Sequence, residues 1–135
     1  MNILVTGHRG YIGAVMVPLL LEAGHRVTGL DCDLYRDCDF VPAGPLAMVP
    51  ELQIDLRDVS VDHLRGFDAI VHLAELSNDP LGDLAPEHTY DINLHASVRL
   101  ARLAKEAGVG RFLYSSSCSV YGAAGDAPLD EDAGF

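Results

Sequence analysis

The sequence predicts an α/β fold in which helices cover both faces of a parallel β-sheet. Three observations support this prediction. Short apolar runs rich in Val, Ile and Leu alternate along the chain with longer stretches of helical periodicity. Segments rich in Asp, Pro and Gly separate these runs and mark the connections. The 135 residues are enough for one domain, and alternating strands and helices of this kind form parallel sheets.

The first three expected elements are a strand, a helix and a second strand. Residues 2–6 (NILVT) are a short, β-branched run before a glycine-rich turn, which is typical of a buried strand. Residues 11–23 are apolar on most faces and end before Gly24, so we expect a helix there, although an interior Pro18 is unfavourable. Residues 26–30 (RVTGL) are the second expected strand.

The middle of the chain contributes a loop, two strands and a short helix. Residues 32–50 are rich in Asp, Pro and Gly and are predicted to be a loop. Residues 52–54 form the third expected strand, and residues 60–65 suit a short helix. Residues 68–73 (DAIVHL) are again a short apolar run and form the fourth expected strand.

The last expected elements are a loop, a long helix and a fifth strand. Residues 76–86 are rich in Pro, Gly and Asp and are predicted to be a loop. Residues 86–107 form the longest helical segment, and Gly108 is a suitable stop. Residues 111–115 (RFLYS) are the fifth expected strand.

We expect these elements to form a Rossmann-type, doubly wound sheet, a three-layer αβα arrangement with strand order 3-2-1-4-5 and right-handed crossovers. In this order the sheet grows in one direction from the first strand and then in the other. A ligand would therefore bind at the carboxyl ends of the first and fourth strands, in the crevice that the reversal opens.

Charge and composition narrow the possible partners. Twenty acidic and nine basic residues give a formal net charge of −11, which disfavours nucleic acid and anionic membranes. No apolar run reaches the ~18 residues of a membrane span, and the first residues do not resemble a secretory signal. Cys32, Cys38 and Cys118 are odd in number and widely spaced, which favours a reduced, cytoplasmic setting. The acids near the first two match no zinc pattern, so no metal site is expected.

The segment 6–13 (TGHRGYIG) joins the first strand to the first helix. Gly7 permits a tight turn, Gly10 lets a pyrophosphate approach the backbone, and Gly13 lets the helix pack closely on the strand. Phosphates would then meet the free N–H groups and positive end of the helix. An acid stands 18 positions beyond Gly13, which completes the pattern of a dinucleotide site. The alternative is a plain βα turn that merely needs glycine.

Asp31, directly after the second strand, would accept hydrogen bonds from the hydroxyls of an adenosine ribose. Its charge would repel a 2′-phosphate, which favours NAD over NADP. Arg9 favours NADP instead, because a basic residue in this turn can contact a 2′-phosphate. Asp31 holds the position nearer the ribose, so we expect NAD. The alternative is that Asp31 is only the first of four acids in a loop.

Five short motifs occur in order along the chain. The turn has the spacing T-G-x-x-G-x-x-G, and the other motifs are residues 55–58 (DLRD), 71–74 (VHLA), 91–97 (DINLHAS) and 115–122 (SSSCSVYG). Together they resemble the extended short-chain dehydrogenase/reductase family. The branch most similar to this chain is that of the NAD-dependent epimerases and dehydratases of nucleotide sugars, which includes the UDP-galactose 4-epimerases.

The resemblance implies a role for each matching residue. The cofactor-binding residues would be Gly7, Gly10, Tyr11, Ile12 and Gly13 at the pyrophosphate turn, Asp31 at the ribose, Asp55 and Leu56 at the adenine, Leu73 and Ala74 along the groove, and Asn93 and Ser115. Asn93 would also serve structure and proton relay. Ser117 would be the catalytic hydroxyl, which can donate to a developing oxyanion on the substrate. Tyr121 is expected to be a pocket or packing residue and not the catalytic base.

Two features depart from the family pattern. Glu75 replaces an alanine after Ala74, and a carboxylate near the cofactor would either point to solvent or weaken binding. The family's base is a Tyr-x-x-x-Lys pair, but the only lysine is Lys105 and no tyrosine stands four residues before it. We therefore expect residues 1–135 to be an incomplete NAD-binding domain, lacking that segment and the substrate domain, and to be inactive alone.

The resemblance implies a complete enzyme in which tightly bound NAD takes a hydride from a nucleotide sugar and returns it. One alternative is a non-catalytic protein that binds or senses a dinucleotide, and another is an NADP-dependent reductase of the same superfamily. An exposed apolar edge beside the fifth strand would favour the enzyme domain, and a satisfied surface would favour the sensor. Besides the nucleotide-sugar substrate, the expected partner is a second copy, paired through helix 87–107 as in the family's dimers.

Overall fold

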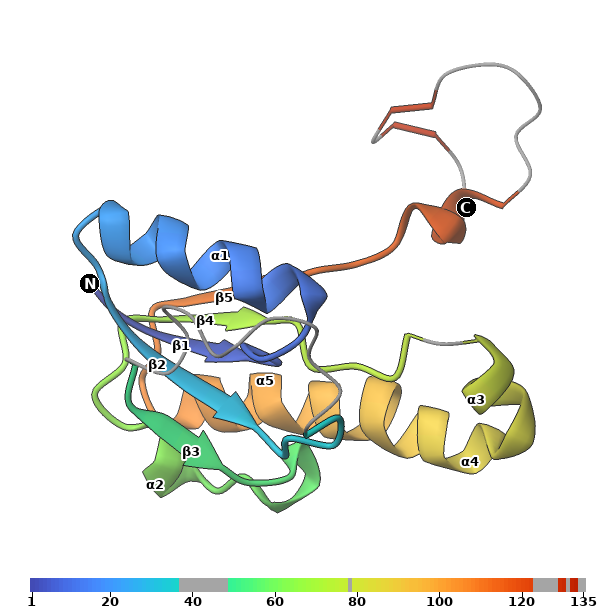
Figure 1. The fold of residues 1–135 in the computed structure, drawn as a ribbon, viewed down its shortest axis with the longest axis horizontal. Coiled ribbons are helices and arrows are strands. Elements are labelled where there is room, and N and C mark those ends of the chain that lie inside the picture. The colour runs from blue at the N-terminus through green and yellow to red at the C-terminus, as the bar shows by residue number, and fades with distance from the viewer. Residues whose placement is uncertain (37–48, 78, 123–128, 131, 134–135) are drawn as a thin grey trace.

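The computed structural model describes residues 1–36, 49–77, 79–122, 129–130 and 132–133. The strands of its sheet are β1 (Asn2–Thr6), β2 (Arg26–Asp31), β3 (Glu51–Gln53), β4 (Ala69–His72) and β5 (Arg111–Tyr114). They are ordered β3-β2-β1-β4-β5, and every neighbouring pair is parallel, which confirms the prediction. The arrowheads of β1, β2 and β4 point to the same edge of the sheet (Figure 1).

Helices cover both faces of the sheet. They are α1 (Tyr11–Glu22) on one face, and α2 (Val61–Leu64) and α5 (Ser97–Glu106) on the other (Figure 1). Alternate side chains of β1 point to opposite faces, as the strand period requires. Ile3 and Val5 are buried in one cluster with Val17 of α1. Leu4 is buried in a second cluster with Leu100 of α5, so the core has two layers and the fold has three.

Prolines stand inside α1 and in the first turn of α3 (Asp79–Leu84). Helix α1 continues through Pro18, because the neighbouring Val17 is fully buried against the sheet and such packing supplies most of a helix's stability. The prediction of a loop over 76–86 is wrong over Asp79–Leu84, where α3 forms, and at Pro86, which begins the next helix. Pro80 stands in the first turn of α3, where the N–H that proline lacks would have no partner within the helix.

The predicted helix 86–107 is helical throughout but is not one regular α-helix. It consists of α4 (Pro86–Thr89), the π-helical segment η3 (Tyr90–Ala96) and α5. The wider turn of η3 brings Oγ of Ser97 within 3.4 Å of the carbonyl oxygen of Ile92. Turns of this kind are frequent at functional sites.

Beyond β5 the chain leaves the sheet. The short 3₁₀ turn η4 (Cys118–Tyr121) follows and stands away from the three layers (Figure 1). The predicted loop 32–50 and the polar segment after Gly122 lie largely outside the described residues. Within the described part of the chain, none of the helices combines the length and apolar character that crossing a membrane requires.

Candidate functional site

The turn after β1 is shaped by two of its glycines. Gly7 has a φ of +70°, a left-handed conformation that favours glycine, and its N–H donates to the carbonyl of Leu30 at 2.8 Å. A Cβ on Gly7 would lie 2.8 Å from the backbone nitrogen of Ala74. A Cβ on Gly13 would lie 2.5 Å from the carbonyl oxygen of Gly7. The turn therefore packs against the end of β4 and the start of α1 without room for side chains.

Gly10 differs from these two glycines because it is exposed. It is the N-cap residue of α1, no side chain caps the helix there, and the first turn holds no acidic residue. The first N–H groups of a helix have no carbonyl partner within the helix. Those of Tyr11 and Ile12 are therefore available to bind an anion, which the positive end of the helix also favours.

A buried chain of hydrogen bonds joins the ends of β1 and β4 to α5. Oγ1 of Thr6 accepts from the N–H groups of Leu73 at 3.2 Å and Ala74 at 3.3 Å. Its own proton is therefore donated to Nδ1 of His72 at 2.6 Å. Nε2 of His72 then carries the ring proton and donates to Oγ of Ser97 at 2.8 Å. Burial lowers the pKa of His72 to about 4, so the ring is neutral at pH 7.

Asn93, on η3, holds the loop that follows β4. Its Oδ1 accepts from the N–H of Leu76 at 2.8 Å, and its Nδ2 donates to the carbonyl of the same residue at 2.9 Å. Both polar groups of the side chain are thus engaged by one loop residue. Asn93 therefore positions the segment that continues from Ala74, while its part in proton relay stays a prediction.

Asp31 stands at the carboxyl end of β2, beside the glycine turn. Its Oδ2 accepts from the N–H of Arg9 at 3.1 Å, and its Oδ1 accepts from the N–H of Asp33 at 2.9 Å. These two bonds fix the plane of the carboxylate. The glycine turn, the start of α1, the end of β4 and Asp31 therefore share the edge at which the strand order predicts a ligand.

Comparison with known proteins agrees with this arrangement. A model of the NAD dependent epimerase/dehydratase family matches residues 3–135. The chain belongs to this family. A UDP-glucose 4-epimerase of Neisseria meningitidis serogroup A is 35% identical over 140 residues, which cover 97% of this chain and 41% of that protein. A 3 beta-hydroxysteroid dehydrogenase/Delta 5-->4-isomerase of Mycobacterium tuberculosis is 33% identical over 123 residues, covering 88% of this chain and 32% of that protein.

A solved structure of the same kind shares the fold. The UDP-glucose-4-epimerase of Stenotrophomonas maltophila, solved with bound NAD and formylated UDP-arabinopyranose, is 30% identical and superposes with a TM-score of 0.87. The match covers 98% of this chain and 42% of that chain. These matches confirm the predicted family and the predicted fold. They also confirm that the family depends on NAD. The chain spans about two fifths of the length of the Neisseria and Stenotrophomonas proteins.

In this member of the epimerase/dehydratase family, the two residues expected at the adenine, Asp55 and Leu56, differ in their surroundings. Asp55 caps the 3₁₀ turn η2 (Leu56–Asp58) and binds Arg57 through its backbone N–H at 2.8 Å and its guanidinium at 2.8 and 3.0 Å. These hydrogen bonds hold the pKa of Asp55 below its usual range. The side chain of Leu56 is buried in the core with Leu4, so only its backbone remains for a cofactor.

The serines after β5 are exposed. The N–H of Ser115 still donates to the carbonyl of His72 at 3.2 Å, which extends the β4–β5 ladder. Ser117 caps η4, and its Oγ accepts from the N–H of Ser119 at 3.2 Å. Ser117 is therefore an exposed residue at the start of η4, the turn that stands away from the three layers in Figure 1. Tyr121 lies in η4 and is half-buried.

Glu75, the departure from the family motif, does not point freely into solvent. It is half-buried, and it forms a hydrogen bond with the side chain of Tyr114 at the end of β5. This carboxylate raises the pKa of Tyr114. The Oε1 atom of Glu75 is buried and has no hydrogen-bond partner among the described residues. Its effect on cofactor binding stays a prediction.

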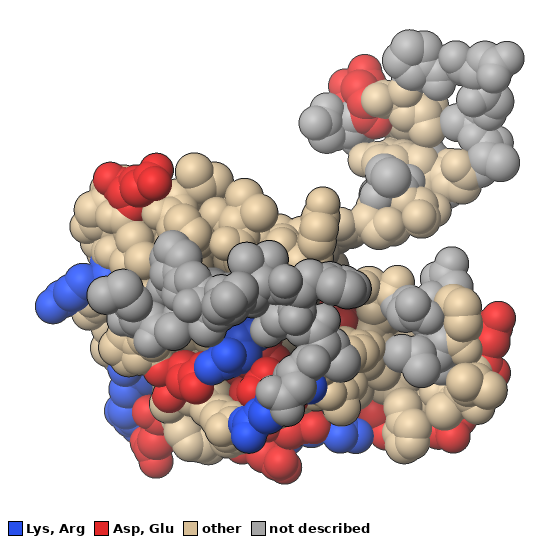
Figure 2. Space-filling view, in the orientation of Figure 1, with Lys and Arg blue, Asp and Glu red and all other residues tan. Residues whose placement is uncertain are grey.

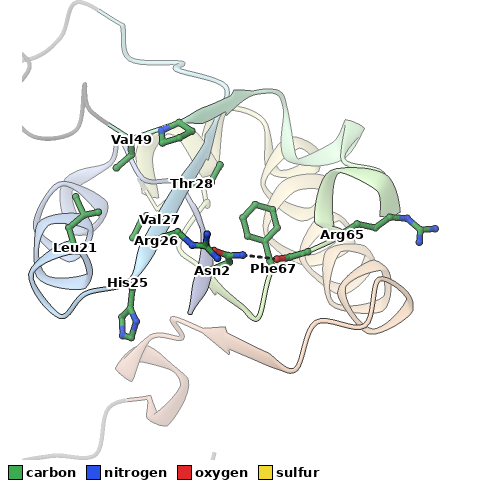
Figure 3. A pocket seen from close by; sticks show the side chains of 11 residues that line it. Asn2, Leu21, His25, Arg26, Val27, Thr28, Val49, Arg65 and Phe67 are labelled. Atoms are coloured by element: carbon green, nitrogen blue, oxygen red, sulfur yellow. Dashed lines mark hydrogen bonds between the residues drawn. The ribbon is translucent and has the colours of Figure 1, made fainter.

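A separate hollow of about 530 Å³ lies at the opposite edge of the sheet (Figure 3). Its lining includes Asn2 and Arg26, which begin β1 and β2, together with Phe67 before β4. The glycine turn is at the other ends of these strands. The hollow is therefore not the crevice in which the strand order predicts a dinucleotide. Among the described residues, no group of three or more potential metal ligands occurs.

Three features of the site were not predicted from the sequence. The first is the pair between Arg9 and Glu51, with 2.8 Å between Nη2 and Oε2. The second is the burial of His8 beneath it. The third is the Thr6 hydroxyl on His72. One signal was present for His8, since a glycine inside a strand often marks close approach of another group, and Gly29 makes room for this ring.

Proposed function

We propose that this chain is the NAD-binding portion of a nucleotide-sugar epimerase or dehydratase. The observation that carries the proposal is the uncapped N-terminus of α1 beside the end of β4, with Asp31 fixed at the end of β2. The residues present fit a dinucleotide, because the exposed Gly10 leaves the first turn of α1 open. When bound, NAD would accept a hydride from the sugar and return it.

The protein's own part begins with binding. Backbone N–H groups of Tyr11 and Ile12 would donate to the diphosphate, whose negative charge the helix dipole favours. Asp31 would accept from the ribose hydroxyls through the lone pairs that Arg9 and Asp33 leave free. The hydrogen bond between Thr6 and His72 would fix the ends of β1 and β4 relative to each other. Because the buried ring is neutral, it would have no charge to attract it to the phosphates and would keep this bond when the cofactor binds.

Substrate chemistry would involve Ser117, whose hydroxyl would donate to the oxygen of the sugar that changes oxidation state. In the described structure this hydroxyl accepts from Ser119 and is exposed, so its proton is free to be donated. The relatives include both a UDP-glucose 4-epimerase and a hydroxysteroid dehydrogenase/isomerase. The proposal of a nucleotide sugar rests on the first of these and on the Stenotrophomonas structure.

Surface exposure favours an enzyme domain over a free-standing sensor. Leu113 and Tyr114 of the edge strand β5 are 51% and 50% exposed. On α1, Ile12, Val15 and Leu19 form an exposed apolar stripe. In Figure 2 the surface of α1 is largely uncharged, whereas charged side chains gather in the lower half of the view. Large exposed apolar patches of this kind are typical of interfaces.

We also propose pairing with a second copy through residues 87–107. One face of this segment is core, but Leu94 and Val98 are exposed one helical turn apart. Sedimentation of the unaltered chain and of the Leu94→Glu variant would test this proposal. The unaltered chain should be a dimer, and the variant should be a monomer. The free, exposed thiol of Cys32 agrees with the proposed reduced, cytoplasmic setting.

Calorimetric titration with NAD tests the central proposal. The chain should bind NAD, and Asp31→Ala should weaken binding by at least about tenfold, since a hydrogen bond to a charged group contributes about 1.5–3 kcal/mol. Asp62→Ala, which removes an acid paired with Arg65 on α2, is the matched control and should bind as the unaltered chain does. A folded chain that binds no NAD would contradict the proposal.

A further inference from the structure

Arg9, the basic residue of the glycine turn, is held by Glu51, the first residue of β3. Its Nε donates to Oε2 at 2.9 Å and its Nη2 donates to Oε1 at 2.9 Å, so the contact is bidentate and fixes the guanidinium plane. About a third of each side chain is exposed, 34% for Arg9 and 33% for Glu51. The hydrogen bond to Glu51 raises the pKa of Arg9. The positive charge of the turn is thus already paired, on the β3 side of the site.

A buried histidine, His8, lies next to the carboxylate of Glu51 on its core side. His8 is fully buried, with Nε2 3.3 Å from Oε2 of Glu51 and Nδ1 3.9 Å from Oδ2 of Asp31. Neither ring nitrogen makes a hydrogen bond with a described residue, although both lie within ion-pair distance of a carboxylate. The ring fills the space over Gly29, where a Cβ would clash with Cδ2 of His8. Glu51 and Asp31 are therefore kept at the surface of the site.

The surroundings of Arg9 carry an excess of negative charge. Asp31, Asp33 and Glu51 all act on its guanidinium, and Arg36 is paired with Asp33. The backbone N–H of Arg9 donates to Asp31, so its side chain starts beside the acid that a ribose would contact. In dinucleotide-binding folds, an arginine near this acid accommodates the 2′-phosphate of NADP. If Arg9 were not bound to Glu51, its guanidinium could lie beside Asp31, in the position of such an arginine.

We propose that Glu51 is a second cofactor-specificity residue, which holds Arg9 on β3 and so denies a 2′-phosphate its only cationic partner in the turn. The proposal rests on the proposed function, since it concerns the dinucleotide of the same site. Asp31 repels the 2′-phosphate directly. Glu51 acts by occupying the group that would otherwise offset that repulsion.

The proposal predicts a specific dependence on Arg9. Glu51→Gln keeps the size of the side chain but removes the charge that holds the guanidinium. The preference for NAD over NADP should then fall about tenfold, the scale of a charge-assisted hydrogen bond. Arg9→Ala alone should leave the preference within about twofold of the original, because the paired guanidinium takes no part. In Glu51→Gln/Arg9→Ala the preference should return to its original level.

Calorimetric titration of each variant with NAD and with NADP measures these preferences. Asp62→Asn, which removes one negative charge from a remote ion pair, is the control and should change neither affinity. An unchanged preference in Glu51→Gln would overturn the proposal. So would an equal fall in the double variant, because Glu51 would then act through its own charge and not through Arg9.

Two further outcomes complete the test. If Glu51→Gln does not fold, Arg9→Ala carries the decision alone, since a fivefold or greater loss of NADP affinity would show that Arg9 already contacts the 2′-phosphate and would overturn the proposal. If the folded, unaltered chain binds neither dinucleotide, the proposed function fails and this inference fails with it. Binding of NAD with an unchanged preference in Glu51→Gln contradicts this inference alone.

Discussion

Nδ1 of His72 lies 2.6 Å from Oγ1 of Thr6 in a buried hydrogen bond that ties the end of β4 to the end of β1. These are the two strands between which the order of the sheet reverses. The same hydroxyl accepts from the N–H groups of Leu73 and Ala74, the residues expected to line the groove. A side chain of the core therefore sets the shape of the proposed binding site.

Replacing this hydroxyl should destabilise the fold. Thr6→Val keeps the shape but leaves His72 and the N–H of Ala74 without their partner, whereas the N–H of Leu73 keeps its bond to the carbonyl of Thr6, so the free energy of unfolding should fall by about 2–3 kcal/mol. Thr6→Ser retains the hydroxyl and should lose less. Urea denaturation measures both variants, and equal losses in the two would show that the methyl group, not the hydroxyl, matters.

Stability should depend on pH through His72. Its pKa is about 4 in the folded chain and 6.5 in the unfolded chain, because burial disfavours the charged ring. Below pH 6.5 the unfolded chain takes up a proton that the folded chain excludes, so the free energy of unfolding should fall by up to about 3 kcal/mol as the pH drops toward 4. His72→Gln should flatten this slope, whereas exposed His95→Gln should not. Urea denaturation between pH 7 and pH 4 tests it, and a slope that survives in His72→Gln contradicts the assignment.

Gly29 and His8 should behave as a coupled pair. A side chain at Gly29 meets the buried ring, so Gly29→Ala should destabilise the chain by about 1–3 kcal/mol. In a chain that also carries His8→Gly, the same change should cost much less, because the ring is gone. Thermal unfolding of the two single variants and the double variant gives the coupling. Additive losses would mean that the two positions do not touch.

Much of the fold could be predicted from the sequence because its signals are local. The runs that became β1, β2 and β4 are each only four to six residues long, and Gly7 and Gly13 lie six positions apart. The π-turn of η3 could not be read this way, since it depends on packing across the sheet and on the hydroxyl of Ser97. The periodicity of 86–107 indicated only a helix.

The parts of the site that escaped prediction are contacts between distant residues. Arg9 and Glu51 are 42 positions apart, and Thr6 and His72 are 66 apart. Nothing in one sequence indicates that a turn arginine will find a carboxylate on β3. The Asn93 motif was recognised, but its engagement of Leu76 through both amide groups depends on how η3 meets the loop after β4.

Loss of the Asn93 amide should loosen that loop. Asn93→Ala removes both hydrogen bonds to Leu76 and should lower the free energy of unfolding by about 1–3 kcal/mol. Asn93→Asp keeps the acceptor for the N–H of Leu76 but loses the donor to its carbonyl, so an intermediate loss is expected. Amide hydrogen exchange at Leu76 reports the loop directly, and unchanged protection in Asn93→Ala would refute the positioning role.

We propose that the N-terminus of α1 binds the diphosphate of NAD. Titration of NAD into the ¹⁵N-labelled chain, followed through backbone amide chemical shifts, tests it most directly. We predict the largest changes at Gly7 and at Tyr11 to Gly13, with smaller changes near Asp31. Changes confined to the hollow at Asn2, Arg26 and Phe67, or no changes in a folded chain, would contradict the account.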